Sequence, residues 1–222
     1  MLTRPGVKPF AILAGFLLSL ACWGPGAARL PAQTAAQELD ARNSQMIGQA
    51  PPAWSTEGWV NSKPLDVKQL RGKVVLLRFL DDNPRGATGL KELVRAYSAR
   101  GLAVVGLFAP QPMPAETPLE HVRDLVSAQG FEFPVGLYSR WETLNRYWLP
   151  QADADRAAAL FLIDRQGIIR YIQPDGQFEK NSRNRVLRRE YEKLENAIEG
   201  LLKSEEGTSA VQRNGSTTFS NR

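Results

Sequence analysis

Two apolar runs separated by an amphipathic segment constrain the fold of this chain more than any other feature. Residues 74–79 are apolar except for Arg78, which is typical of a strand covered on both faces. Apolar side chains then recur at i, i+3, i+4 and i+7 from Leu90, a helical spacing that ends before Gly101. Residues 102–108 form the next apolar run. The sequence therefore predicts a strand–helix–strand unit within an α/β domain.

The rest of the domain is predicted to add three helices and three strands. Residues 117–120 (TPLE) read as a capping box with Pro118 at the first helical position, and Gly130 ends that helix. The further predicted elements are a strand in 131–137, a helix at 139–148, a hairpin of strands 160–163 and 168–172, and a last helix at 183–203. The apolar stripe of the last helix, expected on the sheet, is Leu187, Tyr191, Leu194, Ile198 and Leu201.

Composition and cysteine content narrow the function classes. The chain has 222 residues, enough for one domain with tails, and 43% of them are hydrophobic, as in ordinary globular proteins. A net charge of +5 with scattered basic residues argues against nucleic-acid binding. Cys22 is the only cysteine. Since thiol–disulfide turnover within one chain needs an attacking and a resolving thiol, this chain cannot perform it alone.

The N-terminus has the pattern of an export segment. Arg4 and Lys8 precede an apolar stretch at 10–22. Three outcomes stay open: cleavage after a small residue near 26–28 or after Ala32, lipidation of Cys22, or an uncleaved membrane anchor. Each places the domain outside the cytoplasm, in the periplasm or anchored and facing it. The predicted organisation is an export segment or anchor (1–23), a flexible tether (24–47), a domain (48–203) and a disordered tail (204–222).

Residues 71–80 (RGKVVLLRFL) and 159–170 (ALFLIDRQGIIR) together resemble thioredoxin-like domains. The resemblance is to the TlpA/ResA-type and redoxin (AhpC-TSA-like) proteins of bacterial envelopes, and residues 50–70 are similar to their N-terminal hairpin. It implies a thioredoxin-like α/β fold, with a central mixed β-sheet flanked by helices on both faces. It also implies thiol–disulfide chemistry at a Cys-x-x-Cys motif directly after the first core strand.

Both functional landmarks of that family are missing here. Residues 81–87 contain no cysteine. The family's cis-proline would fall on Ala158, where a cis bond would cost about 2.5–4 kcal/mol. The two cysteines would fall on one of two pairs, depending on the direction of alignment: Pro84 and Ala87, or Asn83 and Gly86. The sequence therefore predicts a degenerate redox site with no catalytic residue.

The candidate site is the groove that the resemblance places beside the missing motif. Its predicted binding residues are Asp81, Asp82, Asn83, Pro84, Arg85, Ala87 and Ala158. Two interpretations of the acidic residues stay open: oxygen ligands of a cation, or capping of a turn by Asp82 or Asn83 at the positive end of a helix dipole. The second is favoured, so neither a metal nor a cofactor is predicted. His121, the only histidine, is expected on the surface, and Trp54 and Trp59 are expected to pack in the domain.

Three functions are compatible with this pattern. The preferred one is a redox-inactive thioredoxin-like module that binds a protein or peptide of the cell envelope. The second is a thiol–disulfide oxidoreductase that acts with an external thiol or a redox partner. The third is a structural envelope protein whose domain only spaces the tether from the last helix and tail.

Overall fold

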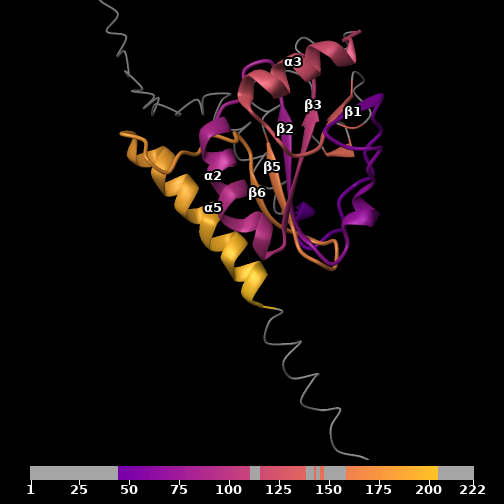
Figure 1. Cartoon of the computed structure of the whole chain (residues 1–222). Helices are drawn as coiled ribbons and strands as arrows, with labels where there is room; N and C mark the ends of the chain where they lie inside the picture. The colour runs from indigo at the N-terminus through magenta and orange to yellow at the C-terminus, as the bar shows by residue number, and fades with distance from the viewer. Residues whose placement is uncertain (1–44, 111–115, 139–142, 144–145, 148–158, 205–222) are drawn as a thin grey trace, which may run out of the picture.

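A computed structural model describes residues 45–110, 116–138, 143, 146–147 and 159–204 (Figure 1). The predicted export segment, most of the predicted tether and the predicted tail beyond Ser204 lie outside the described residues, and so do Cys22 and Ala158. Most of the predicted helix at 139–148 also falls outside them. In the part of the chain that is described, no helix is both long and apolar enough to cross a membrane.

Six strands form one mixed sheet in the order β1-β4-β3-β2-β5-β6. Strands β2, β3 and β4 run parallel, and β5, β6 and β1 are antiparallel to their neighbours. The central position of β2 explains its apolar sequence, because all seven of its residues are buried. The strands are β1 (Gly58–Val60), β2 (Val74–Leu80), β3 (Leu102–Phe108), β4 (Val135–Leu137), β5 (Leu160–Ile163) and β6 (Ile169–Gln173).

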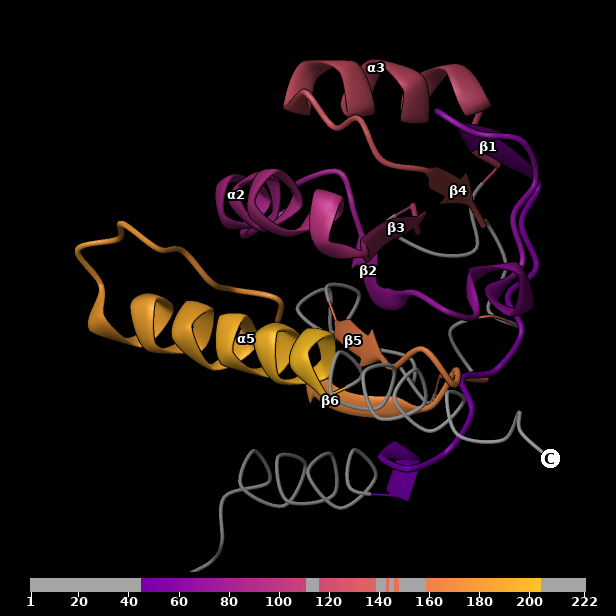
Figure 2. The same cartoon turned by 60° about the horizontal axis from the view of Figure 1, so that its bottom comes forward.

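Three α-helices cover one face of the sheet: α2 (Ala87–Tyr97), α3 (Leu119–Gln129) and α5 (Arg185–Lys203). The 3-10 helix η1 (Val67–Leu70) and Trp54 pack on the opposite face. Figure 2 shows the three helices on one side of the sheet and the N-terminal segment on the other. The predicted thioredoxin-like α/β fold with a mixed sheet is confirmed. Of the helices predicted on both faces, the described α-helices lie on one face, and the other is covered by η1.

Side chains of strand β2 point alternately into two hydrophobic cores, one on each face of the sheet. Val74 and Leu76 face the three helices, whereas Val75, Leu77 and Phe79 belong to the core beneath η1. Arg78 lies on the same face of β2 as Val74 and Leu76, because side chains alternate along a strand. The charged Arg78 side chain is therefore placed between the sheet and the helices.

The N-terminal hairpin expected at 50–70 is wrong. Strand β1 pairs antiparallel with β4, far along the chain, and residues 67–70 form η1 instead of a second strand. Asp66 caps η1 through its side chain, which accepts a hydrogen bond from the Lys68 N–H at 2.7 Å. Trp54 is 8% exposed and Trp59 packs against the same core, so the predicted packing role of both indoles is confirmed.

Two helix details also differ from the sequence predictions. Pro118 occupies the N-cap of α3 and makes no side-chain cap, and Glu120 pairs with Arg123 rather than reaching back, so the predicted capping box is absent. In α5, Leu202 replaces Leu201 as the last buried residue of the stripe. The helical period of 3.6 residues accounts for this shift, because a repeat of four and three drifts around the helix over several turns.

Candidate functional site

The loop between β2 and α2 is held by its own polar groups. The carboxylate of Asp81 accepts a hydrogen bond from the Asn83 N–H at 2.9 Å, which closes an Asx turn. Pro84 is buried, and Gly86 adopts φ 74° at the N-cap of α2 without a side-chain cap. The predicted turn cap by Asp82 or Asn83 is therefore wrong, since Asp81 forms the turn and a glycine begins the helix.

The other wall of the site comes from residues 176–178, which press against the start of α2. A Cβ atom added to Gly86 would lie 2.6 Å from the carbonyl oxygen of Gly176. One added to Gly89 would lie 2.8 Å from the carbonyl oxygen of Phe178. Neither position therefore has room for a side chain. The two glycines allow segments almost 90 residues apart in sequence to meet backbone to backbone.

Arg78 of strand β2 connects this loop to the sheet. Its side chain is 1% exposed, and its guanidinium donates a hydrogen bond of 2.8 Å to the carbonyl oxygen of Arg85. Burial lowers the pKa of Arg78 to about 10, against the favourable charges of Asp81 and Asp175. The guanidinium still carries its charge at neutral pH and fixes the backbone of the loop.

Asp81 and Tyr138 are two buried titratable residues that interact electrostatically without a hydrogen bond between them. Burial raises the pKa of Asp81, opposed by the hydrogen bond from Asn83 and the charge of Arg78. Burial also raises the pKa of Tyr138, and the charge of Asp81 adds to this effect. The Tyr138 hydroxyl has no hydrogen-bond partner among the described residues, and its ring packs edge-on against Phe79. This phenol therefore stays protonated at neutral pH.

His121 lies beside the same loop, although it belongs to α3. Its Nε2 lies 2.5 Å from the carboxylate of Asp82, and its ring packs edge-on against Phe108. The side chain is 52% exposed, so the predicted surface location is confirmed. The contact with Asp82 was not predicted, because no local pattern connects residues 39 positions apart.

A pocket of about 310 Å³ opens at the N-terminus of α2. Of the predicted binding residues, Pro84, Arg85 and Ala87 line it, whereas Asp81 is buried behind the loop and Asp82 turns to His121. Between the two candidate cysteine pairs, both members of the pair Pro84 and Ala87 line the pocket. The full lining is Pro84, Arg85, Gly86, Ala87, Thr88, Gln177, Phe178, Glu179 and Leu187.

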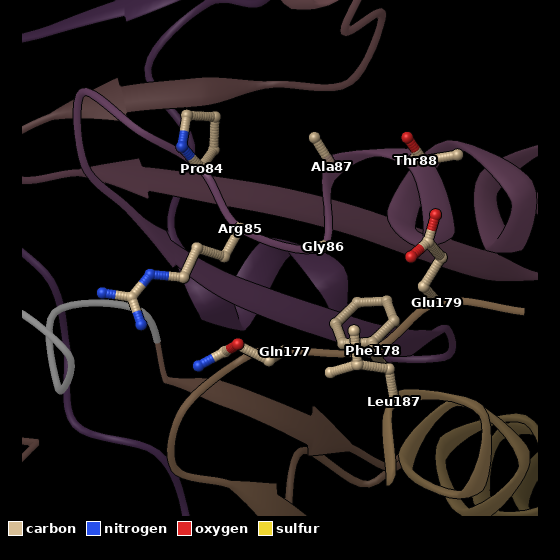
Figure 3. Close-up of a pocket in the computed structure, with 9 residues that line it drawn as sticks. All are labelled: Pro84, Arg85, Gly86, Ala87, Thr88, Gln177, Phe178, Glu179 and Leu187. Atoms are coloured by element: carbon tan, nitrogen blue, oxygen red, sulfur yellow. The ribbon is translucent and has the colours of Figure 1, made fainter. Parts of the chain in front are cut away.

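The pocket has two differently charged sides with an apolar surface between them. Figure 3 shows Arg85 and Gln177 on one side and Thr88 and Glu179 on the other. Phe178 and Leu187 supply the apolar surface. Such a lining can contact both polar and apolar groups of a ligand.

The C-terminal wall of the pocket was missed by sequence analysis. Residues 177–179 follow β6 in an irregular segment without a motif, and Leu187 was assigned only to the buried stripe of the last helix. A second glycine three residues after Gly86 was the one sequence signal of a close backbone approach. In the described part of the chain, no group of three His, Cys, Asp or Glu residues could hold a metal ion.

The chain is similar in sequence to known proteins over part of its length. No protein-family model matches the chain. Protein DipZ of Mycobacterium bovis and of Mycobacterium tuberculosis are each 32% identical to it over 140 residues, which is 58% of this chain. The chain spans 19% of the length of these relatives.

Solved structures share the architecture at low sequence identity. A putative protein disulfide isomerase from Bacteroides thetaiotaomicron has a TM-score of 0.53 at 22% identity, covering 73% of this chain and 94% of its own. A putative thiol:disulfide interchange protein DsbE from Chlorobium tepidum has a TM-score of 0.54 at 20% identity, covering 70% and 97%. A thiol-disulfide isomerase from Corynebacterium glutamicum has a TM-score of 0.53 at 23% identity, covering 68% and 96%. The domain therefore has the thioredoxin-like fold that the resemblance implied, and residues 48–203 contain no cysteine.

Proposed function

We propose that this protein is a redox-inactive thioredoxin-like module that binds a polypeptide in the pocket at the N-terminus of α2. The observation that carries the proposal is the coincidence of two features. The pocket is lined by Pro84 and Ala87, one of the two pairs of positions where the resemblance would place the dithiol, and no thiol is present in the domain. The proposed binding site is therefore a cavity without a thiol.

The construction of the loop supports a binding role. A buried arginine, an Asx turn and a tight glycine contact hold the backbone around the pocket. A preorganised site loses less conformational entropy when a ligand binds, which favours affinity. A vestigial loop would not need the buried charge of Arg78, whose desolvation opposes folding.

The partner and the location belong to the same proposal. The partner is a protein or peptide of the cell envelope, and the domain lies on the far side of the cytoplasmic membrane, cleaved from its export segment or tethered by it. The basic and apolar pattern at the N-terminus supports this location.

A peptide library tests the binding role. Random peptides displayed on phage are selected against the full chain and against the variant Ala87→Trp, which fills the pocket. The matched control is Ala96→Trp, at an exposed position of the same helix. Peptides that bind the parent and the control but not the Ala87 variant support the proposal. Peptides that bind all three proteins equally, or a failure to enrich any peptide, contradict it.

A turbidity assay separates binding from redox activity. Insulin is mixed with dithiothreitol, with and without the protein, and the rate of precipitation is followed. Without a cysteine in the domain, the protein should leave the rate at the level of the blank. A rate above the blank would favour an oxidoreductase that uses an external thiol.

A further inference from the structure

The segment leading into α5 carries a dense positive charge, an exception to the scattered distribution of basic residues noted in the sequence. Residues 180–189 (KNSRNRVLRR) contain five basic and no acidic side chains; we call them the basic segment. Arg183, Arg185 and Arg189 are exposed in it, and Val186 is 63% exposed. Val186 is one of only two large apolar side chains with high exposure among the described residues.

This charge lies at the wrong end of the helix for stability. The N-terminus of an α-helix carries a partial positive charge, so acidic side chains stabilise it and basic ones destabilise it. Helix α5 has no acidic residue in its first turn and begins at Arg185. Its glutamates follow only from Glu190 onward. The distribution of charge along α5 therefore opposes folding of the helix, so helix stability does not explain why basic residues stand at its start.

Only part of the basic segment has a structural partner. Lys180 pairs with Glu195 at 3.4 Å, and the guanidinium of Arg188 donates to the carbonyl oxygen of Ser182 at 2.7 Å. In contrast, the three exposed arginines, at positions 183, 185 and 189, form no ion pair with any described residue. Their charges remain available to an external anion.

The basic segment borders the candidate pocket. Leu187 lines the pocket and lies between Val186 and Arg188 in the chain. Figure 3 shows Leu187 beside Phe178, where α5 begins, with Arg85 further along the same pocket. A chain leaving the pocket past Leu187 would thus cross the first turn of α5, where the arginines and Val186 are exposed.

We propose that the basic segment extends the pocket into a docking surface for an acidic polypeptide segment. This inference rests on the proposed binding function and adds the chemistry of the partner. Guanidinium groups bind carboxylates through paired hydrogen bonds, and Val186 offers an apolar contact between them. The pocket favours a polypeptide over an anionic membrane, because Thr88, Gln177 and Glu179 in its lining can form hydrogen bonds with peptide N–H and C=O groups.

Fluorescence anisotropy with defined peptides tests the surface. The probe is a fluorescein-labelled peptide of alternating glutamate and valine, compared with the same peptide carrying glutamine or lysine in place of glutamate. The full chain is compared with a triple variant, Arg183→Glu, Arg185→Glu and Arg189→Glu. We expect the glutamate peptide to bind the parent at least about tenfold more tightly than either comparison peptide. We expect the triple variant to lose at least about tenfold in affinity for it.

A second triple variant controls for net charge. Lys63→Glu, Lys68→Glu and Lys73→Glu change the charge equally at exposed positions before β2, and affinity for the glutamate peptide should stay within about twofold of the parent. Thermal unfolding controls for structure. The arginine variant should melt no lower than the parent, because glutamate suits the start of a helix.

The outcomes separate this inference from the proposed function. If phage-selected peptides bind in the pocket but the arginine reversal leaves their affinity unchanged, the acidic-partner inference is wrong and the binding function stands. If no peptide binds the pocket, both fail. A last experiment measures binding of the full chain to vesicles of phosphatidylcholine with and without the anionic lipid phosphatidylglycerol. Charge-dependent binding to the anionic vesicles, without binding of the glutamate peptide, would overturn the inference in favour of a membrane surface.

Discussion

The buried guanidinium of Arg78 gives the sharpest prediction about how the pocket is built. Replacing it with methionine keeps most of the side-chain volume but removes the charge and the hydrogen bond of 2.8 Å to the Arg85 carbonyl. A hydrogen bond from a charged group contributes about 1.5–3 kcal/mol. The change also removes one of the two cations, Arg78 and Arg85, that favour the ionised form of the buried Asp81. We therefore expect Arg78→Met to lower the free energy of unfolding at pH 7 by about 1.5–3 kcal/mol.

The loss of unfolding free energy in Arg78→Met should depend on pH, and the structure predicts the direction of this dependence. The pKa of Asp81 is raised in the folded protein, so folding takes up a proton as the pH falls, and the related stability is lost as pH rises through the folded pKa. Without Arg78, the ionised Asp81 is less well compensated and its pKa rises further. The difference between Arg78→Met and the parent should therefore be largest at neutral pH and shrink toward pH 4.

Urea unfolding of the full chain, followed by tryptophan fluorescence between pH 4 and 7, measures both effects. The matched control is Arg95→Met, the same chemical change at an exposed position of α2, which should alter stability by less than about 0.5 kcal/mol. If Arg78→Met is as stable as this control at pH 7, Arg78 does not hold the loop. A difference that grows as the pH falls would contradict the role assigned to Asp81.

Three further predictions concern the loop and its neighbours. Gly86→Ala should destabilise the fold by at least about 1–2 kcal/mol in thermal unfolding, because φ is 74° and a Cβ atom would collide with the Gly176 carbonyl oxygen. Gly200→Ala, which has open space around it, should instead stabilise α5 by about 0.5–1 kcal/mol. Equal effects of the two changes would refute the close approach at Gly86. Asn184→Ala removes the N-cap of α5 and should cost about 1 kcal/mol, measured in the same way. A double-mutant cycle between Asp82→Ala and His121→Ala should give a coupling of about 0.2–1 kcal/mol at most, since both side chains are exposed; a larger value would indicate a structural pair.

Local patterns predicted the framework of the domain well. The apolar runs at β2 and β3 and the helical spacing between them depend only on neighbouring residues, and each became the expected element. The turn at 164–167 is another example, with the Gly167 N–H bonded to the carbonyl oxygen of Asp164 at 2.9 Å. The position of the pocket followed from the resemblance, because the loop after the first core strand had a known place in the fold.

Contacts between distant segments could not be predicted in this way. Arg78 was recognised only as an interruption of a strand, since its partners Arg85 and Asp175 lie 7 and 97 residues away and are brought to it by the tertiary fold. The wall formed by residues 177–179 has no periodicity to identify it. The basic segment was visible in the sequence, but its proximity to the pocket depends on where α5 begins to pack.

Photocrosslinking in cells tests the binding role of the pocket most directly. A photoreactive residue is placed at Thr88, which is exposed and lines the pocket, and a control is placed at Asn196, which is exposed in the C-terminal half of α5. A polypeptide bound in the pocket predicts a discrete adduct, identified by mass spectrometry, from Thr88 alone. Diffuse and equal labelling from both positions would contradict a binding site at the N-terminus of α2.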